Sequence, residues 1–250
     1  MTAVPLALEH VARSFGSLEV LRDISLSVLD GEFVALVGPS GCGKTTLLNL
    51  LSGFDQPTSG AVLREGAVRM VYQQDSLFPW RTVNENIGLG LQHVPSFTER
   101  EAQVRDLLHL VSLEQFGHHY PHQLSGGMRQ RAELARALAG DSDILLLDEP
   151  FSSLDYLTRL RLRQELARIL EERPRTVVLV THDIEEAAQL ADRVVVLTER
   201  PAQVRDQLSI SAPRPRDPTD SQVVEATRLI LAELHYAAGG AQPANRAAQR

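Results

Sequence analysis

A glycine-rich loop that contains the only lysine of the chain carries the clearest chemistry in the sequence. The apolar run Val34–Val37 precedes this loop and leucines at helical spacing follow it, so the loop joins a strand to a helix. Glycines let successive N–H groups turn inward, and the positive end of the helix dipole adds to their attraction for an anion. The pattern predicts a phosphate site made of Gly38, Pro39, Ser40, Gly41, Cys42, Gly43, Lys44, Thr45 and Thr46.

Lys44 has the side chain that such a site needs. Its ammonium is a compact charge that can bridge terminal phosphates, whereas a planar guanidinium needs more room and a fork-shaped partner. The chain has 25 basic residues, and all except Lys44 are arginines. A glycine turn that matches the pattern by accident is the alternative, and the strand and helix on either side argue against it.

Two adjacent acids end an apolar strand further along the chain. The segment Asp143–Pro150 places Asp148 and Glu149 at the carboxyl end of that strand, which is the edge where ligands of parallel sheets bind. With Thr45 of the loop, Asp148 is the expected contact for magnesium, and Glu149 is the expected general base that polarises an attacking water. A solvated turn is the alternative interpretation of an acid pair at a strand end.

The elements that position these residues have the pattern of a mixed α/β protein. Buried parallel strands are predicted at Phe33–Val37, Ile144–Leu147, Thr176–Val180 and Arg193–Leu197. The alternation of Val20–Val28 predicts an antiparallel strand, and the spacing in Thr98–Val111 predicts a helix within an inserted helical stretch. After the proline-rich Ser211–Asp220, the segment Ser221–Leu234 has helical periodicity.

Composition narrows the classes of partner. The chain has 250 residues and a net charge of −7, the wrong sign for attraction to a nucleic-acid backbone. Its apolar runs are far shorter than the roughly 20 residues that span a bilayer, and we find no export signal at the N-terminus. A cytoplasmic location is therefore expected, and the single Cys42 can form no internal disulfide.

A second anion-binding pattern precedes the acid-tipped strand. The segment Leu124–Arg131 contains a helix start that is suited to an anion, made of Ser125, Gly126 and Gly127. The alternative interpretation is that the serine only caps the helix. This segment resembles the signature motif of the ATP-binding cassette family. In that family the motif closes over ATP held by a second subunit. The resemblance covers roughly residues 6–199 and implies ATP and Mg²⁺ as ligands.

The resemblance also assigns roles to residues that other patterns leave open. Phe15 resembles the aromatic residue that stacks on adenine, although an isolated phenylalanine is usually in the core. Gln73 resembles the glutamine that touches magnesium and relays nucleotide state, with Gln74 as the neighbouring choice. Asp155 ends the sequence Ser-Ser-Leu-Asp, which resembles the loop through which two subunits communicate. His182 resembles the histidine that contacts the terminal phosphate.

The expected fold follows from this family. It is an α/β P-loop NTPase core, with a mostly parallel sheet, an antiparallel N-terminal β part and an inserted helical subdomain. We expect residues 1–235 to form one ATP-binding domain, with a core of 1–73 and 141–210 and a helical subdomain of 74–140. Residues 211–250 are expected to form a C-terminal helix and a flexible tail. Two departures are the short Gly60–Val71 segment, which predicts a trimmed antiparallel edge, and Met128 in place of the usual glutamine.

One segment indicates which class of transporter subunit the chain resembles. Leu77–Val83, together with Pro150–Arg159, resembles subunits of bacterial importers for nitrate, sulfonates and taurine. In those subunits a helix of the membrane permease docks here, so Phe78 and Trp80 would form an exposed apolar socket; the alternative is that both belong to the core. A periplasmic solute-binding protein would then act indirectly, and the chain would sit peripherally on the inner face of the membrane.

The resemblance implies a mechanism in which two copies sandwich two ATP molecules. Each site would combine one copy's Lys44, Asp148, Glu149, Gln73 and His182 with Ser125 of the other copy. Three competing functions stay open: a soluble ATPase of the same type that serves no transporter, a regulatory module that binds ATP without hydrolysis, and an exporter subunit.

Overall fold

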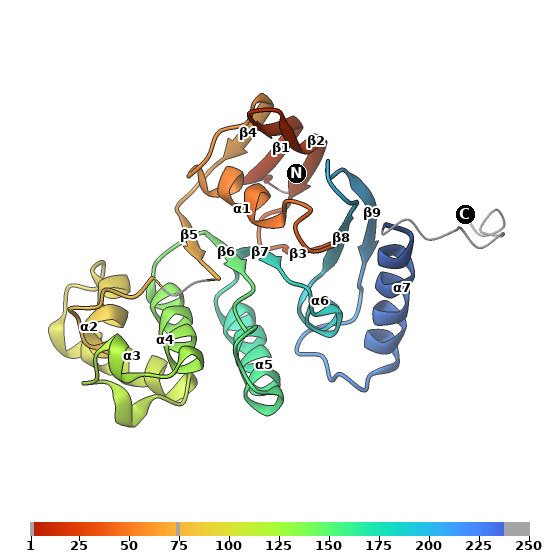
Figure 1. Ribbon diagram of the computed structural model, residues 1–250. Coiled ribbons are helices and arrows are strands. Elements are labelled where there is room, and N and C mark those ends of the chain that lie inside the picture. Colours follow the sequence, from red (N-terminus) through yellow and green to blue (C-terminus); the bar gives the residue numbers. More distant parts are fainter. Residues whose placement is uncertain (1–2, 74–75, 238–250) are drawn as a thin grey trace.

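The computed structural model describes residues 3–73 and 76–237, and their strands form two sheets (Figure 1). In the larger sheet all neighbouring strands are parallel except the last pair, which is antiparallel. Its order is β5 (Val68–Val71), β6 (Ile144–Asp148), β7 (Thr176–Val180), β3 (Phe33–Val37), β8 (Arg193–Leu197) and β9 (Val204–Ser209). The four predicted parallel strands are therefore confirmed, and β9 is an antiparallel edge that the sequence analysis did not anticipate.

Both faces of this sheet are buried, which explains why its strands are continuous apolar runs. Side chains alternate between two cores: in β3, Val34 and Leu36 belong to the cluster on one face, and Phe33, Ala35 and Val37 to the cluster on the other. All five are fully or almost fully buried. This arrangement fixes the strand ends, and therefore the loops that follow them, at one edge of the sheet.

The smaller sheet is antiparallel, as the alternation in residues 20–28 predicts. Its strands are β2 (Leu18–Val28), β1 (Leu6–Phe15) and β4 (Ser59–Arg64), paired in that order. Helix α1 (Lys44–Ser52) packs its leucines into the cluster that also contains the inner face of this sheet. Figure 1 shows α1 between the two sheets. The edge strand β4 is mostly exposed.

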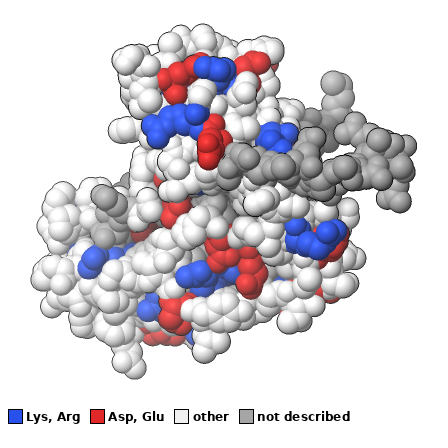
Figure 2. All heavy atoms as spheres, turned by 45° about the vertical axis from the view of Figure 1, so that its right-hand side comes forward, with Lys and Arg blue, Asp and Glu red and all other residues white. Residues whose placement is uncertain are grey.

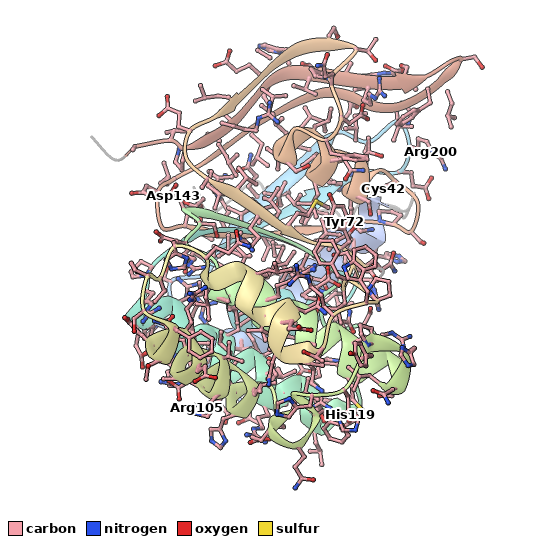
Figure 3. The ribbon with its side chains drawn as sticks, turned by 90° about the vertical axis from the view of Figure 1, so that its left-hand side faces the viewer. Cys42, Tyr72, Arg105, His119, Asp143 and Arg200 are labelled. Carbon is pink, nitrogen blue, oxygen red and sulfur yellow. The ribbon has the colours of Figure 1, made fainter. Side chains whose placement is uncertain are left out.

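A helical region lies between β5 and β6 in the sequence and stands to one side of the sheet in Figure 1. It contains α2 (Val83–Gly88), η1 (Leu89–Leu91), α3 (Phe97–Leu110), η2 (Glu114–Phe116), η3 (Pro121–Gln123) and α4 (Gly126–Ala139). A reciprocal capping box between Thr82 and Glu85 begins α2. Figure 3 shows Tyr72 at the junction of this region, which holds Arg105 and His119, with the part that holds Cys42.

Helices α5 (Tyr156–Glu172), α6 (Ile184–Leu190) and α7 (Ser221–Ala237) complete the fold. The helix predicted at residues 221–234 is confirmed as α7, which packs on α6 and β8. The proline-rich segment before it is anchored by Arg216, which is 4% exposed and donates to the main-chain carbonyls of Ala212, Ala191 and Ile210. The flexible tail expected beyond α7 falls at 238–250, outside the described residues.

Two surface properties bear on the expected partners. On the face drawn in Figure 2, acidic and basic side chains lie beside one another and do not gather by sign. Among the described residues, we find no helix with the length and apolar content that a bilayer crossing requires.

Candidate functional site

The predicted site residues meet at the carboxyl edge of the larger sheet. The glycine-rich loop follows β3, Glu149 follows β6 and His182 follows β7 by two residues, while Gln73 follows β5 by two residues. Because β5, β6, β7 and β3 are consecutive parallel neighbours, these four chain segments emerge side by side. The sheet thus brings residues that are far apart in the sequence together in one site.

The loop between β3 and α1 has a conformation that requires glycine at two positions. Gly41 has φ +73° and Gly43 has φ +125°, which side chains rarely adopt. A Cβ at Gly43 would also lie 2.8 Å from Val20 and 2.9 Å from Leu21 of β2, so the loop is pressed against the antiparallel sheet. The backbone of the loop is therefore held in place before any ligand binds.

Lys44 is the first residue of α1, and its side chain turns back over the loop. Its Nζ donates to the carbonyl oxygens of Gly38 at 2.9 Å and Pro39 at 3.0 Å, and the residue is 8% exposed. Gly43, the N-cap of α1, offers no side-chain acceptor to the first N–H groups of the helix, which leaves them suited to an anion. Lys44 and the helix start thus direct positive charge to the same place.

Cys42 contributes to this loop only through its main chain. Its side chain is buried, and a Cβ at Gly38 would lie 3.1 Å from the Cys42 sulfur. Burial raises the pKa of the Cys42 thiol, and the nearby charges of Lys44 and Arg200 only partly oppose this. Cys42 and Arg200 are both labelled in Figure 3, in the part of the molecule that holds the loop. The thiol is therefore a packing group and not a nucleophile.

Asp148 at the end of β6 is a buried acid, with 2% of its surface exposed. Burial and the nearby Glu149 raise the pKa of Asp148, while a hydrogen bond with Thr45 and the charge of Lys44 oppose the rise. Its carboxylate and the Thr45 hydroxyl are hard oxygen donors, the type that Mg²⁺ prefers. The pair thus has the chemistry of a magnesium site beside the phosphate loop.

Glu149 lies between two polar groups from the neighbouring strands. Gln73 Nε2 donates to Glu149 Oε2 at 3.1 Å, and His182 Nδ1 lies 3.2 Å from Glu149 Oε1. The backbone of Glu149 has φ +48°, a left-handed conformation that is uncommon outside glycine and that occurs at functional sites. The structure thus brings together three residues expected to be catalytic. The alternative Gln74 lies outside the described residues.

The backbone of Glu149 is held by a residue that the sequence analysis did not assign. Gln130 of α4 is 6% exposed, and its Nε2 donates to the Glu149 carbonyl at 2.9 Å. Its Oε1 accepts hydrogen bonds from the main-chain N–H and the hydroxyl of Ser153. A signal was present, because Gln130 occupies the same helical face as Leu134 and Ala137, where a polar residue is out of place.

A buried ionic cluster lies behind His182. Thr181 Oγ1 donates to Glu186 Oε2 at 2.6 Å and accepts from Asp183 N at 2.9 Å. Arg163 of α5, 2% exposed, contacts both Asp183 and Glu186. Burial raises the pKa of Glu186 to about 7, although Arg163 and the Thr181 hydroxyl oppose this. The sequence analysis missed this cluster, because its members have no motif spacing.

Phe15, expected at the adenine, ends β1 at the turn into β2. It is 49% exposed and so is not a core residue. The Arg13 guanidinium lies 4.3 Å from the centroid of its ring, and Arg13 is itself held by Asp55 at 2.9 Å. A guanidinium over a ring covers one of its two faces, so the second face is the one suited to a base.

The remaining predicted residues lie at helix starts away from α1. Ser125 caps α4, where its hydroxyl accepts from Met128 N, and Asp155 caps α5, where its carboxylate accepts from Thr158 N at 3.0 Å. Gly126 is exposed, and a Cβ at Gly127 would lie 3.1 Å from the Leu154 side chain. Figure 1 shows α4 and α1 on different sides of the larger sheet.

Phe78 and Trp80 are exposed, which excludes the alternative that both are core residues. Phe78 is 40% exposed and Trp80 is 69% exposed. Their ring centroids are 5.4 Å apart with the planes tilted by 52°, and the Arg136 guanidinium lies 5.8 Å from the Phe78 centroid. The two rings, which we call the aromatic pair, form a fixed apolar feature on the helical region.

Known proteins resemble this chain in sequence and in fold. A family model described as ABC transporter matches residues 21–152. The chain is 47% identical over 203 residues to the aliphatic sulfonates import ATP-binding protein SsuB 1 of Rhodococcus jostii, which covers 79% of this chain and 80% of that protein. It is 46% identical over 216 residues to the nitrate import ATP-binding protein NrtC of Synechococcus elongatus; this match covers 80% of the chain and 33% of NrtC, so the chain spans about a third of that relative.

A solved structure has the same fold. The dimeric structure of a post-hydrolysis state of the ATP-binding cassette MJ0796, bound to ADP and Pi, aligns with a TM-score of 0.75 and 33% sequence identity. The alignment covers 83% of this chain and 99% of that chain.

The buried Glu186 predicts a pH-dependent term in the free energy of unfolding. Its pKa is about 7 in the folded protein and ordinarily 4.5, so the folded state binds the proton more tightly. The stability from this group is therefore fully present below about pH 4.5 and is lost as the pH rises to about 7. In urea unfolding from about pH 5 to about pH 8, Glu186→Gln should gain stability relative to the native chain as the pH rises.

The control is Glu172→Gln, which changes an exposed acid at the end of α5. Its stability difference from the native chain is the baseline with which the Glu186→Gln difference is compared. Parallel curves for Glu186→Gln and the native chain would show that Glu186 does not titrate in this range.

Proposed function

Because the chain belongs to the ABC transporter family, with the fold of an ATP-binding cassette ATPase, we propose that it powers an importer for nitrate, sulfonates or a related small solute. Taurine is among the related solutes that the sequence resemblance favours. The names of two relatives, which describe import of nitrate and of aliphatic sulfonates, support import over export and over a soluble ATPase without a transporter. The domain that does this is residues 1–235.

The nucleotide would be held along the carboxyl edge of the larger sheet. Main-chain amides of the loop from Gly38 to Thr46 and the Lys44 ammonium bind the phosphates, and Phe15 stacks on the adenine. The conformation of Gly41 and Gly43 supports this proposal, because it sets the amides before ATP arrives and so lowers the entropic cost of binding.

Thr45, Asp148 and Gln73 would hold a magnesium ion against the phosphates. Their oxygen atoms are of the type that this ion prefers, and the buried Asp148 already interacts with Thr45. When bound, the ion offsets charge on the triphosphate. The protein contributes the fixed position of these donors.

Glu149 is the proposed general base, and the observation that carries this role is its position between Gln73 and His182. A carboxylate held on both oxygens by neighbouring strands has a defined direction, which is what the activation of one water molecule requires. His182 would contact the terminal phosphate while it orients Glu149. The left-handed backbone of Glu149 is consistent with a residue held for catalysis.

A second copy of the chain would complete the site. Ser125 and Gly126 are exposed and Gly127 is half-buried at the start of α4, a helix on the other side of the larger sheet from α1, and Asp155 lies exposed at the start of α5. In a pair related by two-fold symmetry, each α4 start can face the loop of the other copy. The dimeric structure of the related cassette MJ0796 supports this arrangement.

Replacement of Glu149 by Gln tests the catalytic assignment. Gln keeps the shape of the side chain but cannot accept the proton of water, so ATP should still bind while turnover falls by on the order of a hundredfold or more. Because ATP is not consumed, the variant should also elute as a dimer in gel filtration with ATP and magnesium. Phosphate release and elution volume are the measurements.

The matched control is Glu172→Gln, at an exposed acid that ends α5 and precedes the start of β7. It should hydrolyse ATP at the native rate. Native turnover by Glu149→Gln would remove Glu149 from the role of base, and the absence of hydrolysis in the native chain would contradict the proposed function as a whole.

The aromatic pair Phe78 and Trp80 is the proposed docking point for a helix of the membrane permease. Exposed aromatic rings beside an arginine are typical of energetic centres in protein interfaces. The pair lies in the segment that joins β5 and Gln73 to α2, so contact at the pair can reach the nucleotide site through a short stretch of chain. The chain would then lie peripherally on the inner face of the membrane, and a periplasmic solute-binding protein would deliver the solute to the permease.

Loss of the aromatic pair should uncouple the subunit from its permease. The double variant Phe78→Ser and Trp80→Ser should keep its melting temperature and its ATP affinity, because both rings are exposed. Co-purification with its permease should fall by about tenfold or more, since aromatic residues at the energetic centre of an interface contribute about 2 kcal/mol or more each.

The control is Phe97→Ser, an exposed phenylalanine at the start of α3 (68% exposed). It should co-purify with the permease as the native chain does. If the double variant also binds the permease fully, the docking point lies elsewhere.

A further inference from the structure

Arg159 connects two loops of the proposed nucleotide site. It lies in the first turn of α5, just after the loop that contains Ser152, Ser153, Leu154 and Asp155. Its Nη2 donates to the Leu154 carbonyl at 3.0 Å, and its Nη1 donates to Asp183 Oδ2 at 2.9 Å. Asp183 is the residue directly after His182. One guanidinium fork thus joins the 152–155 loop to the loop that carries the histidine.

Asp183 is held from several directions. Arg163 also contacts its Oδ2, and its Oδ1 accepts from Glu186 N at 3.1 Å, which caps α6. Burial alone would raise the pKa of Asp183, but Arg163, the capping bond and Arg159 outweigh it and lower the pKa below its ordinary value. The carboxylate is therefore a stable, charged anchor for Arg159.

The buried cluster makes the histidine side of this link stiff. Thr181, just before His182, bonds to both Asp183 N and Glu186. Arg163 and Glu186 are almost completely buried, so they have little freedom to rearrange. The residues on both sides of His182 are therefore fixed, while its own ring is 64% exposed and rests on Glu149.

The other end of the 152–155 loop is held by Gln130. This residue contacts Ser153 and the Glu149 carbonyl, so Gln130 and Arg159 hold the same loop at two neighbouring points. Gln130 secures the backbone of the proposed base, and Arg159 secures the loop of the histidine that contacts this base. Movement of the 152–155 loop would therefore be transmitted to Glu149 and to His182 together.

From these contacts we propose that Arg159 is a positioning residue for ATP hydrolysis, which ties the His182 loop to the 152–155 loop so that His182 meets Glu149. This inference rests on the proposed role of Glu149 and His182. Arg159 touches neither residue directly and acts through Asp183 and Leu154. A lysine cannot replace it fully, because a single ammonium lacks the planar fork that reaches two acceptors in fixed directions.

The test compares Arg159→Met and Arg159→Lys with the native chain in steady-state ATP hydrolysis. Arg159→Met should lower kcat by roughly ten- to hundredfold, because a small misplacement of catalytic groups has effects of this size. Its KM for ATP should change by less than about threefold, because the phosphate loop is untouched. Arg159→Lys should recover part of kcat through its contact with Asp183.

A double-mutant cycle separates positioning from general packing. If Arg159 acts through Asp183, the variant that combines Arg159→Met with Asp183→Asn should be no slower than the slower single variant. Arg168→Gln, which removes an exposed arginine from the same helix, is the matched control and should keep the native kcat. Folding is checked by circular dichroism for every variant.

Each outcome bears on the proposal. A folded Arg159→Met with native kcat would overturn it, and so would a loss confined to KM. Equal kcat values for the Lys and Met variants would contradict the role of the charge at Asp183. If Arg159→Met does not fold, Arg159→Lys carries the same test through its kcat and KM. Failure of the native chain to hydrolyse ATP would instead count against the proposed function.

Discussion

The contact of Lys44 with the carbonyl oxygens of Gly38 and Pro39 is the interaction on which the rest of the site depends. It places a positive charge directly over a loop in which Gly41 and Gly43 have positive φ angles and Gly43 lies against β2. The loop can keep this shape because β3 below it is buried on both faces and α1 beyond it is packed between the two sheets. An anion at this point meets a charge and main-chain amides that need little rearrangement.

The acids that face this charge come from β6, which β7 separates from β3, and they differ in environment. Asp148 is buried beside Thr45, whereas Glu149 is partly exposed and is contacted on both oxygens by Gln73 and His182. One position suits a metal ion and the next suits a water molecule. The unusual backbone of Glu149 makes this difference possible, because it turns the second acid away from the strand direction. Gln130 and the cluster around Asp183 then hold the Glu149 carbonyl and the residues that flank His182, and so support the proposed catalytic groups.

The phosphate loop, the acid pair, Gln73 and His182 were predictable from the sequence because they stand at or just after strand ends, and strand order brings them together. The four parallel strands and the antiparallel N-terminal sheet were predicted for the same reason, since apolar runs and alternation are local signals. The antiparallel β9 alternates only between intermediate and exposed positions and has no buried one, so it gave no such signal. The roles of Gln130, Arg159 and Glu186 depend on contacts between residues far apart or on different helices. No spacing in the sequence encodes these contacts, so only the structure identifies them.

The central claim is that Lys44 and the loop amides grip a triphosphate, and calorimetric titration of the purified chain with ATP and magnesium tests it most directly. The native chain should bind ATP, and Lys44→Ala should weaken this affinity by about ten- to hundredfold, because it loses charge-assisted hydrogen bonds of about 1.5–3 kcal/mol. AMP, which lacks the outer phosphates, should bind both proteins weakly. Equal affinity of the native chain and Lys44→Ala for ATP, or no affinity of the native chain at all, would contradict the account.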